Sequence, residues 1–205
     1  MDLFLRAKHW QLFVAFVVLP FIIGMVFMIN MLMNILPDSE PDPIKIFSHL
    51  KFFPLVVILF MAGKMCWQWA VAIRLQRLAP PGVQFRNTAF QIFFWFVMLF
   101  YPVLFFCMFS FINSIATAGR MVDPKDFVWF IAIFPLSLFN TFCMFYCYYY
   151  SAKTYKTVEL QRDVTMSDFI LECVLIWFFF VGVWILQPKI NKMIDPDIFP
   201  ERDNA

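Results

Sequence analysis

The sequence contains little charge. Only 15% of its 205 residues are Asp, Glu, Lys or Arg, where an average soluble domain has about 25%. The net charge is +2, so nothing in the composition indicates nucleic-acid binding or electrostatic steering of a partner. Histidine is also scarce, since the chain holds only His9 and His49. These shortages favour a membrane protein over a soluble one and leave few groups for polar chemistry.

Motifs for catalysis are absent. The chain has no HExxH, no P-loop and no dinucleotide-binding fingerprint, and it lacks GxSxG. Glu172 is the one acid inside an apolar block, so no pair of carboxylates is available for acid–base catalysis. We therefore predict that the protein is not an enzyme, with no catalytic residue, no cofactor and no metal.

The five cysteines all lie inside apolar blocks and none lies in a loop, which argues against a disulfide framework and for small buried side chains. Two of them are one helical turn apart, but no histidine or acid accompanies them to complete a metal site. Packing is the expected role of all five, namely Cys66, Cys107, Cys143, Cys147 and Cys173.

Apolar residues make up 62% of the chain and include 30 phenylalanines. They form blocks of about twenty residues, the length that spans a bilayer, and lipid requires each block to be helical. We predict an all-α membrane protein, a single domain over residues 1–205, with five transmembrane helices. The first is expected to be an uncleaved span, because it is longer than the apolar region of a signal peptide. The blocks run roughly over 11–36, 46–73, 88–115, 127–149 and 169–187.

Lysine and arginine orient these helices, because they gather in cytoplasmic loops. They mark the N-terminus and the second and fourth connections, so these are expected in the cytoplasm. The fifth block leaves two alternatives. If it crosses, eight lysines and arginines lie inside and seven outside; if it dips in and returns, eleven lie inside and four outside. Its 19 residues are long enough to cross, and we predict a crossing by a fifth helix over 168–188, followed by a polar tail over 189–205.

Two stretches of sequence resemble each other. DPIKIFSHLKFFPL begins at Asp42, and DPKDFVWFIAIFPL begins at Asp123. Asp is a good helix cap and Pro suits the first turn, so each stretch is expected to open a helix that its later proline bends. The repeat predicts two parallel helical hairpins, 1–77 and 84–158. Accident in a chain rich in Phe and Pro is the alternative.

Lys64 and Glu172 are the charged candidates for a site. If the second span matches the fourth block and begins near Ile46, Lys64 lies close to the cytoplasmic surface and reaches it by snorkelling, and this is the expected position. If the span begins at Pro54, Lys64 lies near mid-membrane. Glu172 follows Ser167 and Asp168, either of which suits a helix cap, and is expected to be an interfacial carboxylate. An ion pair between Lys64 and Glu172 is the sharper alternative.

Asparagines inside the spans are the uncharged candidates. Asn30, Asn113 and Asn140 are expected to join helices by hydrogen bonds, or alternatively to line a polar path. The long connection over 151–169 lacks Gly and Pro and is expected to be a helical extension of the fourth span, with a partner-docking surface as the alternative. The expected contacts are the lipid bilayer and a protein partner or second copy, without nucleic acid.

The segment VTMSDFILECVLIWFFFVGVWILQPKINKM is similar to the C-terminal part of uncharacterised small multi-pass inner-membrane proteins of Bacteroidota. The resemblance is best over 152–194 and implies the inner (cytoplasmic) membrane of a bacterium, but no known activity. Two functions remain open. The first is a non-enzymatic component that scaffolds or assists a membrane complex, and the second is a small transporter or channel.

Overall fold

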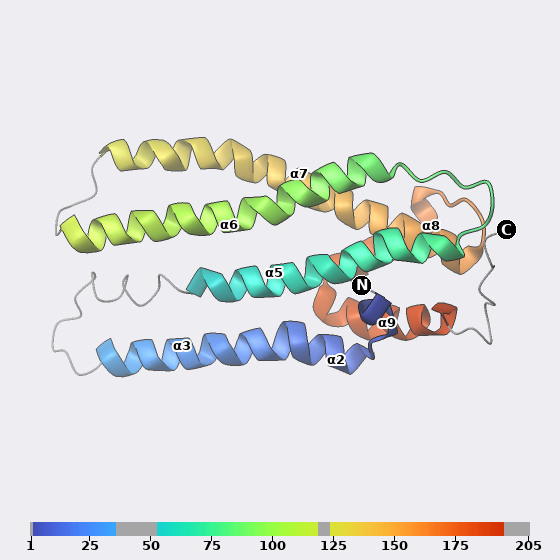
Figure 1. The fold of residues 1–205 in the computed structure, drawn as a ribbon, viewed down its shortest axis with the longest axis horizontal. Helices are drawn as coiled ribbons and strands as arrows, with labels where there is room; N and C mark the ends of the chain where they lie inside the picture. Colours follow the sequence, from blue (N-terminus) through green and yellow to red (C-terminus); the bar gives the residue numbers. More distant parts are fainter. Residues whose placement is uncertain (1, 36–52, 119–123, 195–205) are drawn as a thin grey trace.

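A computed structural model describes residues 2–35, 53–118 and 124–194, and these residues are helical apart from short turns, without a strand. Four long rods lie side by side, and two shorter helices pack against one end of them (Figure 1). The first rod combines α2, a π turn and α3, and the second combines α5 with a π turn and a short 3-10 turn. The elements are α1 Asp2–Arg6, α2 His9–Phe13, the π turn Val14–Val18, α3 Leu19–Ile35, α5 Phe53–Trp69, the π turn Ala70–Arg74, the 3-10 turn Leu75–Leu78, α6 Asn87–Ala118, α7 Pro124–Leu160, α8 Met166–Trp177 and α9 Phe179–Ile194.

The chain runs up and back twice. We call the end that holds α1, the loop 79–86, α8 and α9 the base, and the end where α3 and α6 terminate the far end (Figure 1). The α3/α5 and α6/α7 hairpins run in the same direction, as the sequence repeat predicts. The duplication itself stays a prediction. Of the two repeated stretches, residues 42–52 and Asp123 lie outside the described residues, whereas Pro124 is the first residue of α7, as expected.

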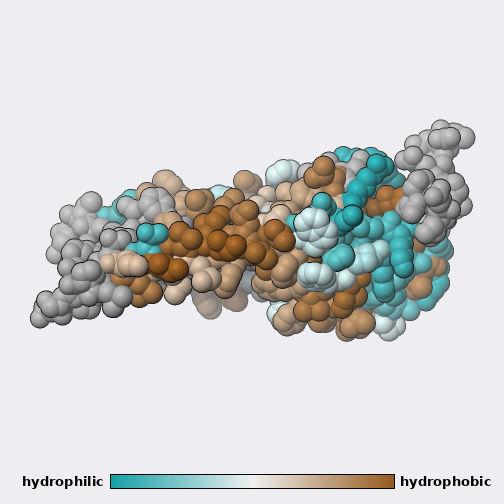
Figure 2. Space-filling view, turned by 90° about the horizontal axis from the view of Figure 1, so that it is seen from below, coloured by the Kyte–Doolittle hydropathy of each residue, from teal (hydrophilic) through white to brown (hydrophobic). Residues whose placement is uncertain are grey.

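Within the described part of the chain, three helices are long and apolar enough to cross a membrane, by length and composition: His9–Met33, Pro54–Leu78 and Asn87–Phe111. Figure 2 shows that apolar side chains cover the middle of the molecule on the face in view, while polar side chains gather at the base. Such an exposed apolar belt suits lipid rather than water. The expectation of an all-helical membrane protein is therefore confirmed at this level.

The fifth apolar block folds back on itself. Its helix breaks at Phe178, where φ is −81° and ψ is 63°, and α9 returns along α8 (Figure 1). The ring centroids of Trp177 at the tip and Phe145 in α7 are 5.8 Å apart. Lys189 near the other end of the hairpin pairs with Glu159 at the base. The prediction of one helix over 168–188 is wrong, because the chain breaks at Phe178 and α9 continues through Pro188 to Ile194. The rest of the predicted polar tail, 195–205, lies outside the described residues.

Local chemistry explains the hairpin. A β-carbon on Gly182 would overlap the carbonyl oxygen of Leu175, so only glycine permits α9 to cross α8 this closely. Helix α8 starts at Met166, with Thr165 and Asp168 as a capping box. The cap, Thr165, lies two residues before Ser167 and three before Asp168, the two caps that the sequence predicts. The predicted helical connector is confirmed as far as Leu160, where α7 ends.

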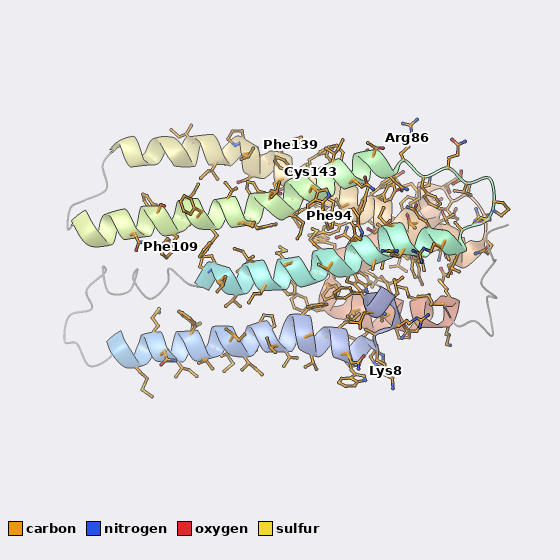
Figure 3. The ribbon with its side chains drawn as sticks, viewed as in Figure 1. Lys8, Arg86, Phe94, Phe109, Phe139 and Cys143 are labelled. Carbon is orange, nitrogen blue, oxygen red and sulfur yellow. The ribbon has the colours of Figure 1, made fainter. Side chains whose placement is uncertain are left out.

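Burial is concentrated in the base half of the molecule. Between Pro54 and Gly63 in α5, no residue is buried, and the same holds for the described side chains of 21–33, 101–113 and 131–139. Side chains crowd together around the base and point outward along the far half (Figure 3), where Phe94 and Cys143 lie in the packed part and Phe109 in the open part. The structure thus joins a compact base to four loosely packed helical arms.

Candidate functional site

Polar side chains gather inside the base, between α5, α7, α8 and α9. Buried among apolar neighbours, they include a lysine, a glutamate and two glutamines, which is unusual for helices of this composition. Three of the four are the partners that hold the α8–α9 hairpin or the first residues of the chain in place. We therefore treat this cluster as the candidate functional site.

Lys64 lies beneath the tip of the hairpin and is only 4% exposed. Its ammonium donates to the hydroxyl of Tyr148 at 3.0 Å and to the carbonyl of Trp177 at 3.3 Å, and it lies 4.5 Å from the centroid of the Tyr148 ring. Trp177 is the last residue of α8, where the helix dipole is negative, so the charge of Lys64 is well placed there. The prediction that Lys64 snorkels to the surface is wrong, because the hairpin covers it.

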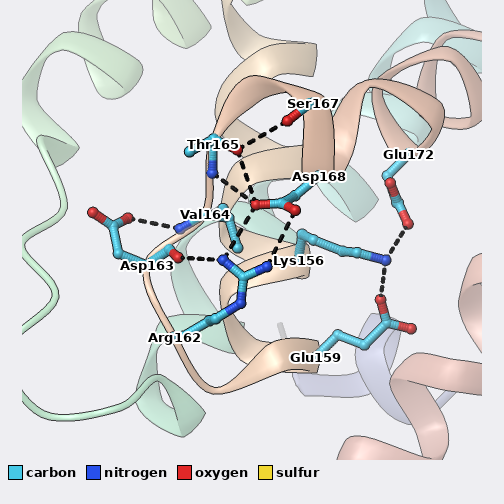
Figure 4. A network of polar contacts seen from close by, with 9 residues as sticks. All are labelled: Lys156, Glu159, Arg162, Asp163, Val164, Thr165, Ser167, Asp168 and Glu172. Carbon is cyan, nitrogen blue, oxygen red and sulfur yellow. Dashed lines mark hydrogen bonds and ion pairs between the residues drawn. The ribbon is translucent and has the colours of Figure 1, made fainter.

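Glu172 is buried in the middle of α8 and has a different cation as its partner. Its Oε1 lies 2.8 Å from Nζ of Lys156, which also contacts Oε2 of Glu159 at 2.7 Å (Figure 4). Glu159 in turn pairs with Lys189 at 3.3 Å. The four charges alternate in sign and join α7 to both arms of the hairpin. Neither the interfacial carboxylate nor the Lys64–Glu172 pair of the sequence predictions is found.

This chain of charges predicts how stability depends on pH. Burial alone raises the pKa of Glu159, but hydrogen bonds and charges from Lys156 and Lys189 outweigh it and hold the pKa below its usual range. Burial alone lowers the pKa of Lys156, but Glu159 and Glu172 outweigh it and raise the pKa. The stabilisation should therefore be complete from about pH 5 to about pH 10. It is lost as the pH falls through the Glu159 pKa or rises through the Lys156 pKa.

Thermal melts of the purified protein in detergent between pH 3 and pH 7 measure the acid side of this dependence. We expect the melting temperature to fall steeply below about pH 4. Glu159→Gln, which keeps the shape but not the charge, should melt lower at pH 7 and show a shallower fall. An equally steep fall in that variant contradicts a role for Glu159.

Gln187 joins α9 to α1. Its amide nitrogen lies 2.9–3.0 Å from the carbonyl oxygens of Phe4, Leu5 and Ala7, which are acceptors left open at the end of α1. Its oxygen accepts the indole N–H of Trp67 at 2.8 Å. Sequence reasoning noted Gln187 only as the end of a block. The sequence signal was the position of Gln187 at the end of a long apolar run, because an amide that is buried there needs hydrogen-bond partners.

A second group of hydrogen bonds that the sequence did not predict holds the beginning of α6 in place. The hydroxyl of Tyr150 donates to Oδ1 of Asn87 at 2.5 Å, and Nε2 of Gln76 donates to the same oxygen at 2.9 Å. These contacts join the three rods α5, α6 and α7 at the base. Asn87 is the first residue of α6, so its side chain lies where the loop enters the bundle.

The three candidate asparagines do not meet. Asn30 is exposed on α3 and donates to the carbonyl of Val26 at 2.9 Å, within its own helix. Asn113 is half-buried near the far end of α6. Asn140 is 5% exposed on α7 and faces the hydroxyl of Tyr101 on α6. Asn140 thus fits the predicted role of joining neighbouring helices.

Some buried polar atoms in the base have no hydrogen-bond partner among the described residues. Both amide atoms of Gln68 are buried without a partner among the described residues, and so is Oε2 of Glu172. Gln68 follows Lys64 by one helical turn, so both lie on the same side of α5. Among the described residues, no three His, Cys, Asp or Glu side chains come together as a metal site.

No protein-family model, no curated protein and no solved structure matches the chain. The resemblance to small Bacteroidota membrane proteins stays a prediction. What the base and the arms do is therefore inferred from their own geometry.

Proposed function

We propose that the protein is a non-enzymatic component of a membrane assembly, which binds a partner membrane protein along its far half. The observation that supports this is the contrast between the two halves. The base is closed by the charge chain and by Gln187, whereas the described side chains of the far half include no buried residue from Pro54 to Gly63 or over 101–113.

A physical argument connects this contrast to binding. Helices in lipid associate through close packing, since lipid tails are as apolar as the side chains. Four arms that bury little against one another retain their packing surface for a further helix. The closed base holds these arms in a fixed arrangement, which lowers the entropic cost of binding.

Site-specific photo-crosslinking tests this proposal in cells of the native host. A benzoylphenylalanine at Phe106, which is 68% exposed in the far half of α6, is expected to give a protein adduct of defined mass. The matched control replaces Trp95, which is 56% exposed in the base half of the same helix, and should give none. The absence of any protein adduct at Phe106, Phe21 and Phe134 contradicts the proposal.

A small transporter or channel is the second candidate, and Lys64 is the observation that favours it. Ionisable side chains inside membrane proteins often mark a path, and interrupted helices often form the binding site of a transporter. Lys64 lies at such an interruption and is followed by Gln68, whose amide is unpartnered among the described residues. Reconstituted liposomes that take up ions or small solutes, with uptake lost in Lys64→Met, support this candidate; the first proposal expects no flux.

A further inference from the structure

We propose that the α8–α9 hairpin enters a single leaflet of the bilayer, on the side of the base, and that lipid acyl chains cover its exposed face. The hairpin would then neither cross the membrane nor lie in water. It would place residues 189–194 on the same side as the N-terminal helix α1. This inference concerns the contact with lipid and is independent of the proposed partner.

Length is the first argument. Helix α8 has 12 residues, so at 1.5 Å per residue it is about 18 Å long. One leaflet contributes about 15 Å of hydrocarbon, half of a typical bilayer core. The apolar part of α9 before Lys189 has a similar length. Each arm therefore matches one leaflet and falls well short of two.

The distribution of side chains is the second argument. The face of the hairpin turned toward α7 carries Glu172, which is 5% exposed and paired. The opposite face and the tip are apolar and at least 43% exposed, and no charged residue occurs between Glu172 and Lys189. A surface of this kind in water is costly. The exposed residues are Ile170, Leu171, Val174, Trp177, Phe178, Phe180, Val181, Trp184 and Ile185.

The open end of the hairpin is charged, as a membrane surface requires. Arg162 and Lys189 are at least half exposed, each beside one acidic partner, and Lys192 is exposed one turn beyond Pro188. Such side chains reach head groups at the edge of the hydrocarbon. The apolar tip and the basic open end are thus separated by about one leaflet.

Continuity with the membrane spans selects lipid as the occupant. Trp184 on α9 packs edge-on against Phe13 of the first rod, with ring centroids 5.4 Å apart. Trp177 packs in the same way against Phe145 of α7, with ring centroids 5.8 Å apart. The exposed face of the hairpin therefore continues the apolar surface of the rods on two sides. The same lipid layer that surrounds the rods reaches both arms.

Depth measurements by electron paramagnetic resonance test the inference. Single cysteines replace Ile170, Val174, Phe178, Val181 and Ile185 in full-length protein that lacks the three half-buried cysteines; Cys143 and Cys147 stay, because both are buried. Each variant carries a nitroxide and is reconstituted in vesicles of phosphatidylcholine and phosphatidylglycerol at about three to one, which gives the membrane surface a negative potential. Accessibility to oxygen and to a nickel chelate then gives depth. Leu99, Val103 and Phe106 on α6 are the spanning controls.

The expected depth rises from residue 170 to 178 and falls again to 185, with the deepest label near mid-bilayer. A crossing helix would give the same rise and fall, so the distance between nitroxides at Met166 and Lys192, both exposed, decides between the two. One straight helix would hold these labels about 39 Å apart, whereas the hairpin brings them much closer. A distance of about 39 Å between the labels at 166 and 192 would show one crossing helix and overturn the inference. High nickel accessibility at every hairpin position would place the hairpin in water, and low accessibility to both reagents would show a protein cover; each overturns it. If the cysteine at 178 prevents folding, 174 and 181 still decide, since both should be deeper than 170 and 185.

Discussion

Gly182→Ala is expected to open the α8–α9 hairpin. The added methyl group would overlap the backbone oxygen of Leu175, which cannot move without moving α8. We expect a loss of about 3 kcal/mol, at the upper end of the cost of overpacking. The matched control is Gly24→Ala on α3, where the new methyl group meets only a side-chain atom of Val56 at 3.9 Å. That variant should be as stable as the wild type or slightly more stable, because alanine favours helix.

The readout is the reactivity of Cys173, which is half-buried on α8. In protein that retains only Cys173 and the buried pair on α7, a polar maleimide should label Cys173 slowly. Gly182→Ala should raise the rate at least tenfold and lower the melting temperature, while Gly24→Ala changes neither. Equal labelling rates in both variants would show that the hairpin tolerates the methyl group and that the close crossing is not required.

Lys156→Met is expected to cause the other large loss. The ammonium of Lys156 lies 2.8 Å from Oε1 of Glu172, whose side chain is 6% exposed. Without it, a buried carboxylate remains next to Glu159. Breaking a buried pair from one side costs about 3–5 kcal/mol, and we expect about 3 kcal/mol because Lys156 is 18% exposed.

A double-mutant cycle measures this coupling. Lys156→Met together with Glu172→Met should recover most of the lost stability, since it removes the unpaired charge and fills the space with apolar atoms. Lys192→Met, at an exposed position of α9, is the control and should change stability little. Additive losses in the double variant would mean that Lys156 and Glu172 do not act as a pair.

The sequence predicts the long helices well because their physics is local. Lipid forces an apolar block into a helix, so α6 covers the whole of the expected 88–115. The connector after Tyr149 continues α7 as far as Leu160, as its lack of Gly and Pro indicates. The N-terminal segment and the second and fourth connections, which the charge pattern places on one side of the membrane, all lie at the base. These features depend on composition and length, which any stretch of the chain carries by itself.

The site depends on contacts between distant segments, which composition does not specify. The fifth block is long enough to cross, and only the Gly182–Leu175 approach and the cover over Lys64 reveal that it returns. Its charge count already favoured an even number of crossings, and the hairpin agrees with that alternative. The sequence predicts Lys64 at the surface because it indicates only the depth of Lys64 along α5. It does not indicate that the hairpin lies against α5 and covers Lys64.

Gln187 has a consequence for the order in which the protein is made. The carbonyl groups of Phe4, Leu5 and Ala7 are synthesised early, but the amide that binds them follows about 180 residues later. Contacts of such long sequence separation form late in folding. The four rods are therefore expected to enter the membrane before α9 binds α1, and the α8–α9 hairpin is expected to pack against them last. Until Gln187 is in place, α1 is expected to be accessible to chaperones and proteases that act on incompletely folded membrane proteins.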